Sequence, residues 1–210
     1  MSEISPFQKH TERYDRWFDK YHWAYQAELK AVRSLLPKEG RGLEIGVGTG
    51  RFAAPLDIVF GVEPVFQMAK MARSRTAGVS GGVAEQLPFR SAHFDFLLMV
   101  TTVCFVDNLD QALEEAKRVL KPNGHLIVAL VDKESSLGQL YENNKEDSVF
   151  YKNATFYSVP ELVAIMKHSG FTNFTFKQTL FHELSKISST EPVKDGHDQG
   201  AFVVISCTKT

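Results

Sequence analysis

Three glycines at alternate positions, Gly46, Gly48 and Gly50, directly follow a short apolar segment over residues 42–45 that predicts a buried strand. Glycine is required where the backbone takes a positive φ angle or approaches a ligand with no Cβ in between. A second apolar run ends at Glu63, whose carboxylate can accept hydrogen bonds from two ribose hydroxyls. A strand, a glycine turn, a helix and a second strand ending in an acid predict a nucleoside site at the carboxyl edge of a parallel sheet.

The spacing of the glycines distinguishes between classes of nucleoside. A dinucleotide fingerprint, G-x-G-x-x-G, places a pyrophosphate on a helix N-terminus. In this chain Arg51 stands where the third glycine of that fingerprint would be, and Glu44 places a negative charge just ahead of the turn. Such a charge repels a phosphate and favours an ammonium group. The pattern therefore argues against a NAD(P)-dependent oxidoreductase, an alternative that binding assays with NADH would test.

The segment E-x-G-x-G-x-G resembles motif I of the class I S-adenosylmethionine-dependent methyltransferases, whose ligand carries an amino acid rather than a phosphate. Three further segments resemble that family in the same order. Residues 82–89 (GVAEQLPF) are similar to the loop that wraps the adenine, residues 94–100 (FDFLLMV) to the fourth strand, and residues 113–126 (LEEAKRVLKPNGHL) to a helix, turn and strand. The match covers roughly residues 43–130 and is closest to the type 11 subgroup, which includes quinone-biosynthesis methyltransferases.

This resemblance implies a fold, a cofactor and a set of contacts. The fold is a three-layer α/β/α sandwich around a mostly parallel seven-stranded sheet of order 3-2-1-4-5-7-6, with the last strand antiparallel. The cofactor is S-adenosyl-L-methionine and the product S-adenosyl-L-homocysteine. The residues implied to bind the cofactor are Glu44, Gly46, Gly48, Thr49, Gly50, Glu63, Pro64, Ala84, Glu85 and Thr101.

One position departs from the family pattern in the adenine loop. Val83 stands where the family usually has an aspartate that accepts a hydrogen bond from the adenine amine. Glu85, two residues further on, or backbone carbonyls are the candidates to replace it. The backbone N–H of Ala84 can still reach the ring, since a change of side chain does not remove it.

Length, charge and cysteine content limit the remaining possibilities. The 210 residues predict one domain, residues 1–210, and the net charge of −1 gives no electrostatic reason to expect a nucleic acid partner. Two cysteines far apart in sequence show no metal-binding or redox spacing, which suits a reducing cytoplasm. No apolar run approaches the roughly 20 residues of a membrane span. We expect a cytoplasmic protein without a metal, either a monomer or a homodimer.

The periodicity of apolar residues predicts alternating strands and helices after one long N-terminal helix over residues 8–36. Asp107 or Asn108 is the expected cap of the helix that starts near residue 110, and Ser158 with Glu161 fits a capping box. Strands are predicted at residues 42–45, 58–62, 79–83, 94–100, 125–131, 171–180 and 201–208, and helices near 51–56, 64–75, 110–120 and 158–169.

Two segments lie outside the expected cofactor core of residues 42–131 and the C-terminal helix and hairpin of residues 158–210. They are the N-terminal helical segment, residues 1–41, and an insertion, residues 132–157. Both can cover the carboxyl edge of the sheet, and their aromatic rings suit a site for a sulfonium cation. For any single ring, packing of the lid onto the body is the alternative. The predicted substrate pocket consists of Tyr14, Trp17, Tyr21, Cys104, Phe105 and Tyr141.

Candidates for acid–base chemistry are few. Cys104 and Phe105 occupy the positions where many relatives carry a histidine pair or His-Trp, so the obvious base is missing. Asp132, at the carboxyl end of the fifth parallel strand, is the candidate to orient a substrate amine or hydroxyl, with a helix cap as the alternative. His22 is the candidate general base, because imidazole titrates near neutrality, with a surface histidine as the alternative.

The resemblance implies methyl transfer to a small-molecule acceptor by direct in-line displacement. Alignment of the nucleophile, the methyl group and sulfur can contribute about 7–11 kcal/mol through proximity alone. The lack of a clear base is compatible with an amine, a thiolate or a pre-ionised oxygen as the acceptor. A catalytically silent S-adenosylmethionine-binding module is the alternative, because Cys104 and Phe105 replace a commonly polar pair.

Overall fold

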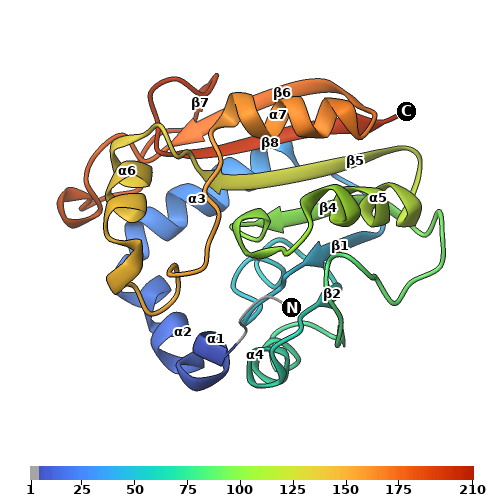
Figure 1. Ribbon diagram of the computed structural model, residues 1–210, viewed down its shortest axis with the longest axis horizontal. Helices are drawn as coiled ribbons and strands as arrows, with labels where there is room; N and C mark the ends of the chain where they lie inside the picture. Colours follow the sequence, from blue (N-terminus) through green and yellow to red (C-terminus); the bar gives the residue numbers. More distant parts are fainter. Residues whose placement is uncertain (1–4) are drawn as a thin grey trace.

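The computed structural model describes residues 5–210, which form an eight-stranded sheet of order β3-β2-β1-β4-β5-β8-β6-β7 (Figure 1). Strands β3, β2, β1, β4 and β5 run parallel, and β8 is antiparallel to both of its neighbours, β5 and β6. The strands are β1 (Gly42–Ile45), β2 (Phe60–Val62), β3 (Gly78–Ser80), β4 (Phe94–Val100), β5 (Leu120–Val131), β6 (Phe171–Thr179), β7 (Lys194–Asp195) and β8 (Phe202–Lys209).

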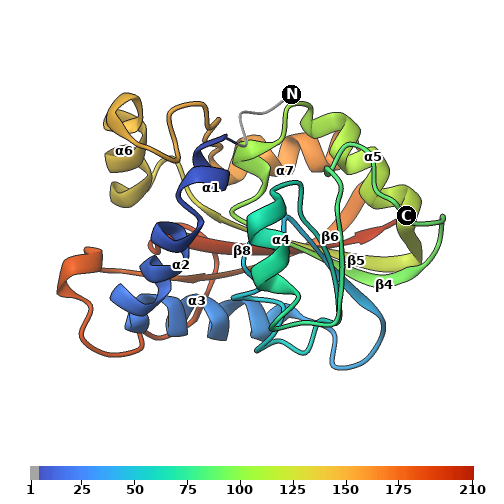
Figure 2. The same cartoon turned by 90° about the horizontal axis from the view of Figure 1, so that it is seen from below.

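Helices cover both faces of this sheet. Seen edge-on in Figure 2, α5 and α7 lie on one face and α3 on the other. Each face has its own apolar core, one around Leu113 and Leu162, the other around Val32 and Phe202. The helices are α1 (Ser5–Lys9), α2 (Thr11–Lys20), α3 (His22–Leu35), α4 (Phe66–Ala72), α5 (Leu109–Val119), α6 (Ser136–Asn143) and α7 (Val159–His168). Short 3-10 turns are η1 (Val103–Phe105), η2 (Lys145–Asp147) and η3 (Leu184–Lys186).

The fold class and strand order predicted from the sequence are confirmed, with one addition. The two-residue strand β7 pairs with β6 and extends the sheet from seven strands to eight. The predicted caps are present: the Asn108 side chain accepts from the Gln111 N–H at 3.1 Å, and Ser158 and Glu161 form the capping box. These local signals place α5 and α7 within a residue or two of the predicted bounds.

The prediction of one continuous helix over residues 8–36 is wrong. The backbone leaves helical geometry at His10 and Tyr21, which divides the segment into α1, α2 and α3. These breaks let α3 pack against β6 and β8 while α2 turns toward the carboxyl edge of the sheet. The helix predicted near residues 51–56 is a series of turns, the strand predicted at 58–62 is reduced to the three residues of β2, and the strand predicted at 79–83 becomes β3 at residues 78–80.

The start of α6 requires glycine at position 138. A Cβ added to Gly138 would lie 2.0 Å from the carbonyl oxygen of Asp132, which is backbone and cannot move aside cheaply. We expect Gly138→Ala to lower the free energy of unfolding by about 1–3 kcal/mol, measured by urea denaturation. Gly81→Ala is the matched control, because no atom of residues 5–210 lies within 4 Å of a Cβ there. Equal stabilities for the two variants would contradict this account of the turn.

Candidate functional site

The glycine turn follows β1 at the carboxyl edge of the sheet. Gly46 and Gly48 have φ angles of +71° and +55°, which disfavour other residues. A Cβ at Gly46 would lie 2.6 Å from the Thr102 hydroxyl, and one at Gly48 would lie 3.5 Å from the hydroxyl of Tyr14. The turn therefore presents bare backbone beneath the N-terminal helices, as the sequence predicts.

Glu63 follows β2 and is held by backbone N–H groups on two sides. Its Oε2 accepts from Gly48 at 2.8 Å, and its Oε1 accepts from Val65 at 2.9 Å. Burial raises the pKa of Glu63 to about 7, although these two hydrogen bonds lower it. Each oxygen keeps a lone pair, so the fixed carboxylate can accept from a pair of neighbouring ligand hydroxyls.

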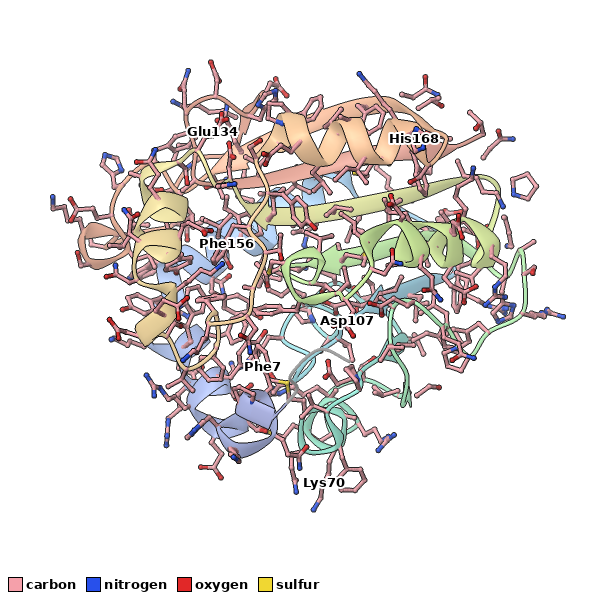
Figure 3. All side chains as sticks on the ribbon, in the orientation of Figure 1. Phe7, Lys70, Asp107, Glu134, Phe156 and His168 are labelled. Atoms are coloured by element: carbon pink, nitrogen blue, oxygen red, sulfur yellow. The ribbon has the colours of Figure 1, made fainter. Side chains whose placement is uncertain are left out.

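A cavity of about 540 Å³ lies over this turn and is called the smaller cavity below. Phe7 and Asp107, both labelled in Figure 3, line it, together with Met68 and Val83. It also includes residues 148–150, 152 and 153 of the insertion. Of the ten residues predicted to bind the cofactor, seven line this cavity: Gly46, Gly48, Glu63, Pro64, Ala84, Glu85 and Thr101.

The other three, Glu44, Thr49 and Gly50, support the turn from beneath and are not among the lining residues. Glu44 is 2% exposed and accepts from the backbone N–H of Ala53, and burial raises its pKa. Its Oε2 has no hydrogen-bond partner within residues 5–210. The Thr49 hydroxyl donates to Asp15, and Gly50 has a φ of +84°.

The carboxylate of Glu85 has a structural partner. Its Oε1 accepts from the backbone N–H groups of Asp107 at 2.7 Å and Asn108 at 3.2 Å, which fixes the start of α5. Asp107 lines the smaller cavity beside it, a position that the sequence analysis considered only as a helix cap. The replacement for the missing family aspartate therefore has a second carboxylate candidate on the same wall.

A larger cavity of about 1300 Å³ lies between α2, α3, α6 and the segment 182–185. Five of the six predicted pocket residues line it: Tyr14, Trp17, Tyr21, Phe105 and Tyr141. Cys104 instead lines a separate void of about 20 Å³, and its thiol donates to the Thr101 carbonyl at 3.3 Å. Burial raises the pKa of Cys104 to about 12, so the thiol stays protonated and has no nucleophilic character at neutral pH.

The two cavities meet along a common wall of seven residues: Phe7, Tyr14, Val100, Thr101, Phe105, Ser148 and Phe150. The ring of Phe7 contacts those of Phe105 and Phe150, with centroids 5.0 and 5.2 Å apart. Here the N-terminal helices and the insertion touch each other. A ligand in the smaller cavity and one in the larger cavity would therefore lie on either side of a wall that includes Tyr14 and Thr101.

The two predicted catalytic residues, Asp132 and His22, lie outside the lining of both cavities. Asp132 is 6% exposed, and its Oδ1 accepts from the Glu134 N–H at 3.1 Å, closing the turn before α6. His22 is exposed at the first residue of α3, with its ring against Trp23. The position of Asp132 fits the capping alternative and that of His22 the surface alternative, and neither supports the catalytic hypothesis. For Asp132, the end of the strand fixes the position of the backbone but not the direction of the side chain.

Sequence reasoning missed Asp15, which connects α2 to the glycine turn. Its carboxylate accepts from the Thr49 hydroxyl at 2.6 Å and from the guanidinium groups of Arg51 and Arg75, each at 2.7 Å. Burial raises the pKa of Asp15, but hydrogen bonds from Arg75 and Arg51 outweigh it and hold that pKa well below its usual range. The available sequence signal was the positive charge of Arg51, which calls for an acidic partner. The sequence analysis used Arg51 only as evidence that the third fingerprint glycine is missing.

A second omission is Glu28 in the middle of α3. It is 6% exposed and lines the larger cavity, and burial raises its pKa to about 8. The sequence signal was a carboxylate on the apolar face of the helix, at the steps occupied by Tyr21, Tyr25 and Val32.

Two features are absent from residues 5–210. No group of three or more His, Cys, Asp or Glu side chains in this part of the chain is arranged to hold a metal ion. The described helices also include none that is long and apolar enough to cross a membrane.

Comparison with known proteins gives consistent matches. Residues 43–128 match the family model "Methyltransferase domain". An uncharacterized protein of Methanocaldococcus jannaschii is 45% identical and covers 98% of this chain and 100% of its own. The ubiquinone/menaquinone biosynthesis C-methyltransferase of Pseudomonas aeruginosa is 30% identical, over 72% of this chain and 71% of its own.

Among solved structures, this chain is similar to a SAM-dependent methyltransferase of Thermotoga maritima, described as a "possible histamine N-methyltransferase". The two are 55% identical with a TM-score of 0.96, over 99% of this chain and 100% of the other.

Removal of the Glu63 carboxylate should weaken binding of S-adenosylmethionine. We expect Glu63→Ala to cost about 1.5–3 kcal/mol of binding free energy, measured by calorimetry with S-adenosylhomocysteine. Because the pKa of Glu63 is raised to about 7, ligand hydroxyls bind its charged form at the expense of a proton. Affinity should therefore rise as the pH increases from 6 to 8, and Glu63→Gln should remove this dependence. Equal affinities for Glu63→Ala, wild type and the exposed control Glu39→Ala would refute this role.

Loss of the charge on Asp15 should loosen α2. We expect Asp15→Asn to lower the free energy of unfolding by about 1–3 kcal/mol at pH 7, between the values of exposed and buried ion pairs. Since the folded-state pKa of Asp15 is depressed, its contribution is present above about pH 4 and is lost as the pH falls below that value. The difference from wild type should shrink accordingly in acid.

The control is Asp19→Asn, which removes a 66% exposed partner of the same Arg51 and should cost under about 1 kcal/mol. Hydrogen exchange should rise in residues 11–20 of Asp15→Asn. Equal effects of the two substitutions would show that Asp15 is no more than a surface ion pair.

Proposed function

The chain belongs to the class I S-adenosylmethionine-dependent methyltransferases, and from that premise we propose that it methylates a small organic molecule held in the larger cavity. It is an enzyme of this class, with S-adenosylmethionine as its cofactor. The single observation that carries the proposal is the common wall of the two cavities. It would place a ligand in the larger cavity next to the one bound over the glycine turn.

The residues of the smaller cavity fit the cofactor. Glu63 would hold the ribose hydroxyls, and Gly46 and Gly48, which line the same cavity, would face the rest of the molecule with backbone atoms. Glu44, buried beneath the turn, has one oxygen without a hydrogen-bond partner within residues 5–210, and an ammonium group reaching it would satisfy that oxygen. When bound, the cofactor supplies an activated methyl group, so the protein has mainly to position the acceptor and exclude water.

The size and composition of the larger cavity support a small acceptor. Its wall is aromatic where it is shared with the smaller cavity. The N-terminal helices, the insertion and the 182–185 segment surround it. The net charge of −1 offers no attraction to nucleic acid. The names of two relatives refer to C-methylation in ubiquinone/menaquinone biosynthesis and to a "possible histamine N-methyltransferase", and both names refer to small organic molecules.

Direct in-line transfer needs few groups from the protein. Tyr14, Thr101 and Phe105 stand at the boundary of the cavities and would align the acceptor with the methyl group. Such alignment can supply about 7–11 kcal/mol of the barrier reduction. Activity therefore does not require Cys104 or a histidine at the end of β4.

Truncation of Trp17 should affect the acceptor but not the cofactor, because Trp17 lines only the larger cavity. We expect Trp17→Ala to raise the acceptor KM at least about tenfold through about 1.5–3 kcal/mol of lost apolar contact. Affinity for S-adenosylhomocysteine should be unchanged. The measurement is S-adenosylhomocysteine formation with a library of small amines, phenols and thiols.

Phe66→Ala, which truncates a 64% exposed ring on α4, is the control. Cofactor binding without turnover on any acceptor would favour the silent-module alternative and refute the proposal.

A further inference from the structure

Glu28 is a buried carboxylate without a protein partner. It lies in the middle of α3, is 6% exposed, and is part of the wall of the larger cavity. No described residue donates a hydrogen bond to it, and burial is the cause of its raised pKa, about 8. An isolated buried carboxylate costs free energy unless another group satisfies it, and such groups concentrate at functional sites.

The other buried carboxylates of residues 5–210 all have hydrogen-bond donors. Asp15 is paired with two arginines, and Glu63 accepts from two backbone N–H groups. Glu44 accepts from Ala53, Asp132 from Glu134, and Glu191 from Phe181. Within this part of the chain Glu28 is therefore the buried carboxylate that lacks a hydrogen-bond donor, and it lines the larger cavity.

The surroundings of Glu28 match an ammonium group. No lysine, arginine or histidine is buried within residues 5–210, so the protein offers no internal counter-charge. The cations on the cavity wall, Arg13, Arg16 and Lys20, are exposed on α2, and Lys20 lies over the Tyr21 ring. Aromatic rings, which attract cations, form much of the remaining wall: Tyr14, Trp17, Phe18, Tyr21, Phe52, Phe105, Tyr141, Phe150 and Tyr151.

We propose that Glu28 binds the amino group of the acceptor and receives its proton, so that the substrate class is small amines. This inference rests on the proposed function, because it places the acceptor in the larger cavity. Tyr14 lines the larger cavity together with Glu28, also lines the smaller cavity, and approaches Gly48 of the glycine turn.

The proposed step balances in atoms and charge. An ammonium group pairs with the Glu28 carboxylate and transfers one proton to it, which frees the nitrogen lone pair. The nitrogen then forms a bond to the methyl carbon while the carbon–sulfur bond breaks and sulfur keeps that electron pair. S-adenosylhomocysteine leaves without the sulfonium charge, the product is a methylated ammonium ion, and the proton on Glu28 returns to solvent. A carboxyl that titrates near the working pH suits this transfer.

The test compares three amines with alcohols of matched shape. Benzylamine, phenethylamine and tryptamine are paired with benzyl alcohol, 2-phenylethanol and tryptophol, and binding is measured by calorimetry with S-adenosylhomocysteine present. Wild type should bind at least one amine at least tenfold more tightly than its alcohol. Glu28→Gln keeps the size of the side chain and should lose that preference, with alcohol and S-adenosylhomocysteine affinities unchanged. Glu12→Gln, at an exposed position of α2 outside both cavities, is the matched control.

A second measurement does not depend on a ligand. Because folding favours the protonated form of Glu28, its presence destabilises the fold progressively as the pH rises from about 4.5 to about 8. The melting temperature of Glu28→Gln should therefore increase relative to wild type across this window. The titratable hydroxyls that interact with Glu28 belong to Tyr14, Tyr25, Tyr141 and Tyr151. The other ionisable side chains on the cavity wall are Arg13, Arg16, Asp19, Lys20, Tyr21, His182 and Glu183.

The outcomes separate this inference from the proposed function. If no amine binds more tightly than its alcohol, or if Glu28→Gln keeps the preference, the inference is overturned even where phenols or thiols are methylated. If amines bind through Glu28 but no S-adenosylhomocysteine forms, recognition of the amine stands and the proposed function fails. A flat difference in melting temperature between pH 4.5 and 8 would show that Glu28 is not an unpaired buried carboxyl.

Discussion

The charge cluster at Asp15 is the interaction on which both cavities depend. It joins α2 to Arg51 and Thr49 of the glycine turn and to Arg75 after α4, three segments that β1 and β2 place at the sheet edge. Because α2 also carries Tyr14 and Trp17, this cluster sets the distance between the aromatic lid and the turn. A partly buried carboxylate with three donors holds one geometry better than apolar contact alone, since each hydrogen bond is directional.

Short-range patterns were enough to predict most of the residues that the structure brings together around the smaller cavity. The alternating glycines, the acid at Glu63 and the caps at Asn108 and Ser158 act within a few residues of their own position. The backbone geometry they require is therefore visible in the sequence. The buried strands then follow from continuous apolar runs, and their order follows from the resemblance to a known family.

Long-range packing explains what the sequence did not reveal. The helix breaks at His10 and Tyr21 depend on where the sheet and the glycine turn lie. The periodicity of aromatic residues continues through both breaks, so it does not reveal them. The Asp132 carboxylate turns back to its own Glu134 amide rather than into a cavity. Glu28 was overlooked because its distinguishing feature is that no described residue donates a hydrogen bond to its carboxylate. Whether a buried carboxylate has a donor can be judged only when the side chains of α2, α6 and the 182–185 segment are in place.

Two sets of segments in this chain thus have different roles in the proposed recognition. In the proposed function the cofactor is held over the glycine turn and by the Glu63 carboxylate, which backbone N–H groups fix at the ends of parallel strands and which belongs to the family motif. The acceptor cavity is built by α2, α3, α6 and the 182–185 segment, which meet only after folding. Under the role proposed for Glu28, this buried carboxylate would select by charge, because a neutral ligand leaves Glu28 unpaired, whereas an ammonium group would satisfy it and would itself be stabilised by the aromatic rings of the wall. On this proposal, specificity resides in the segments outside the family motif, and the chemistry common to the family resides within it.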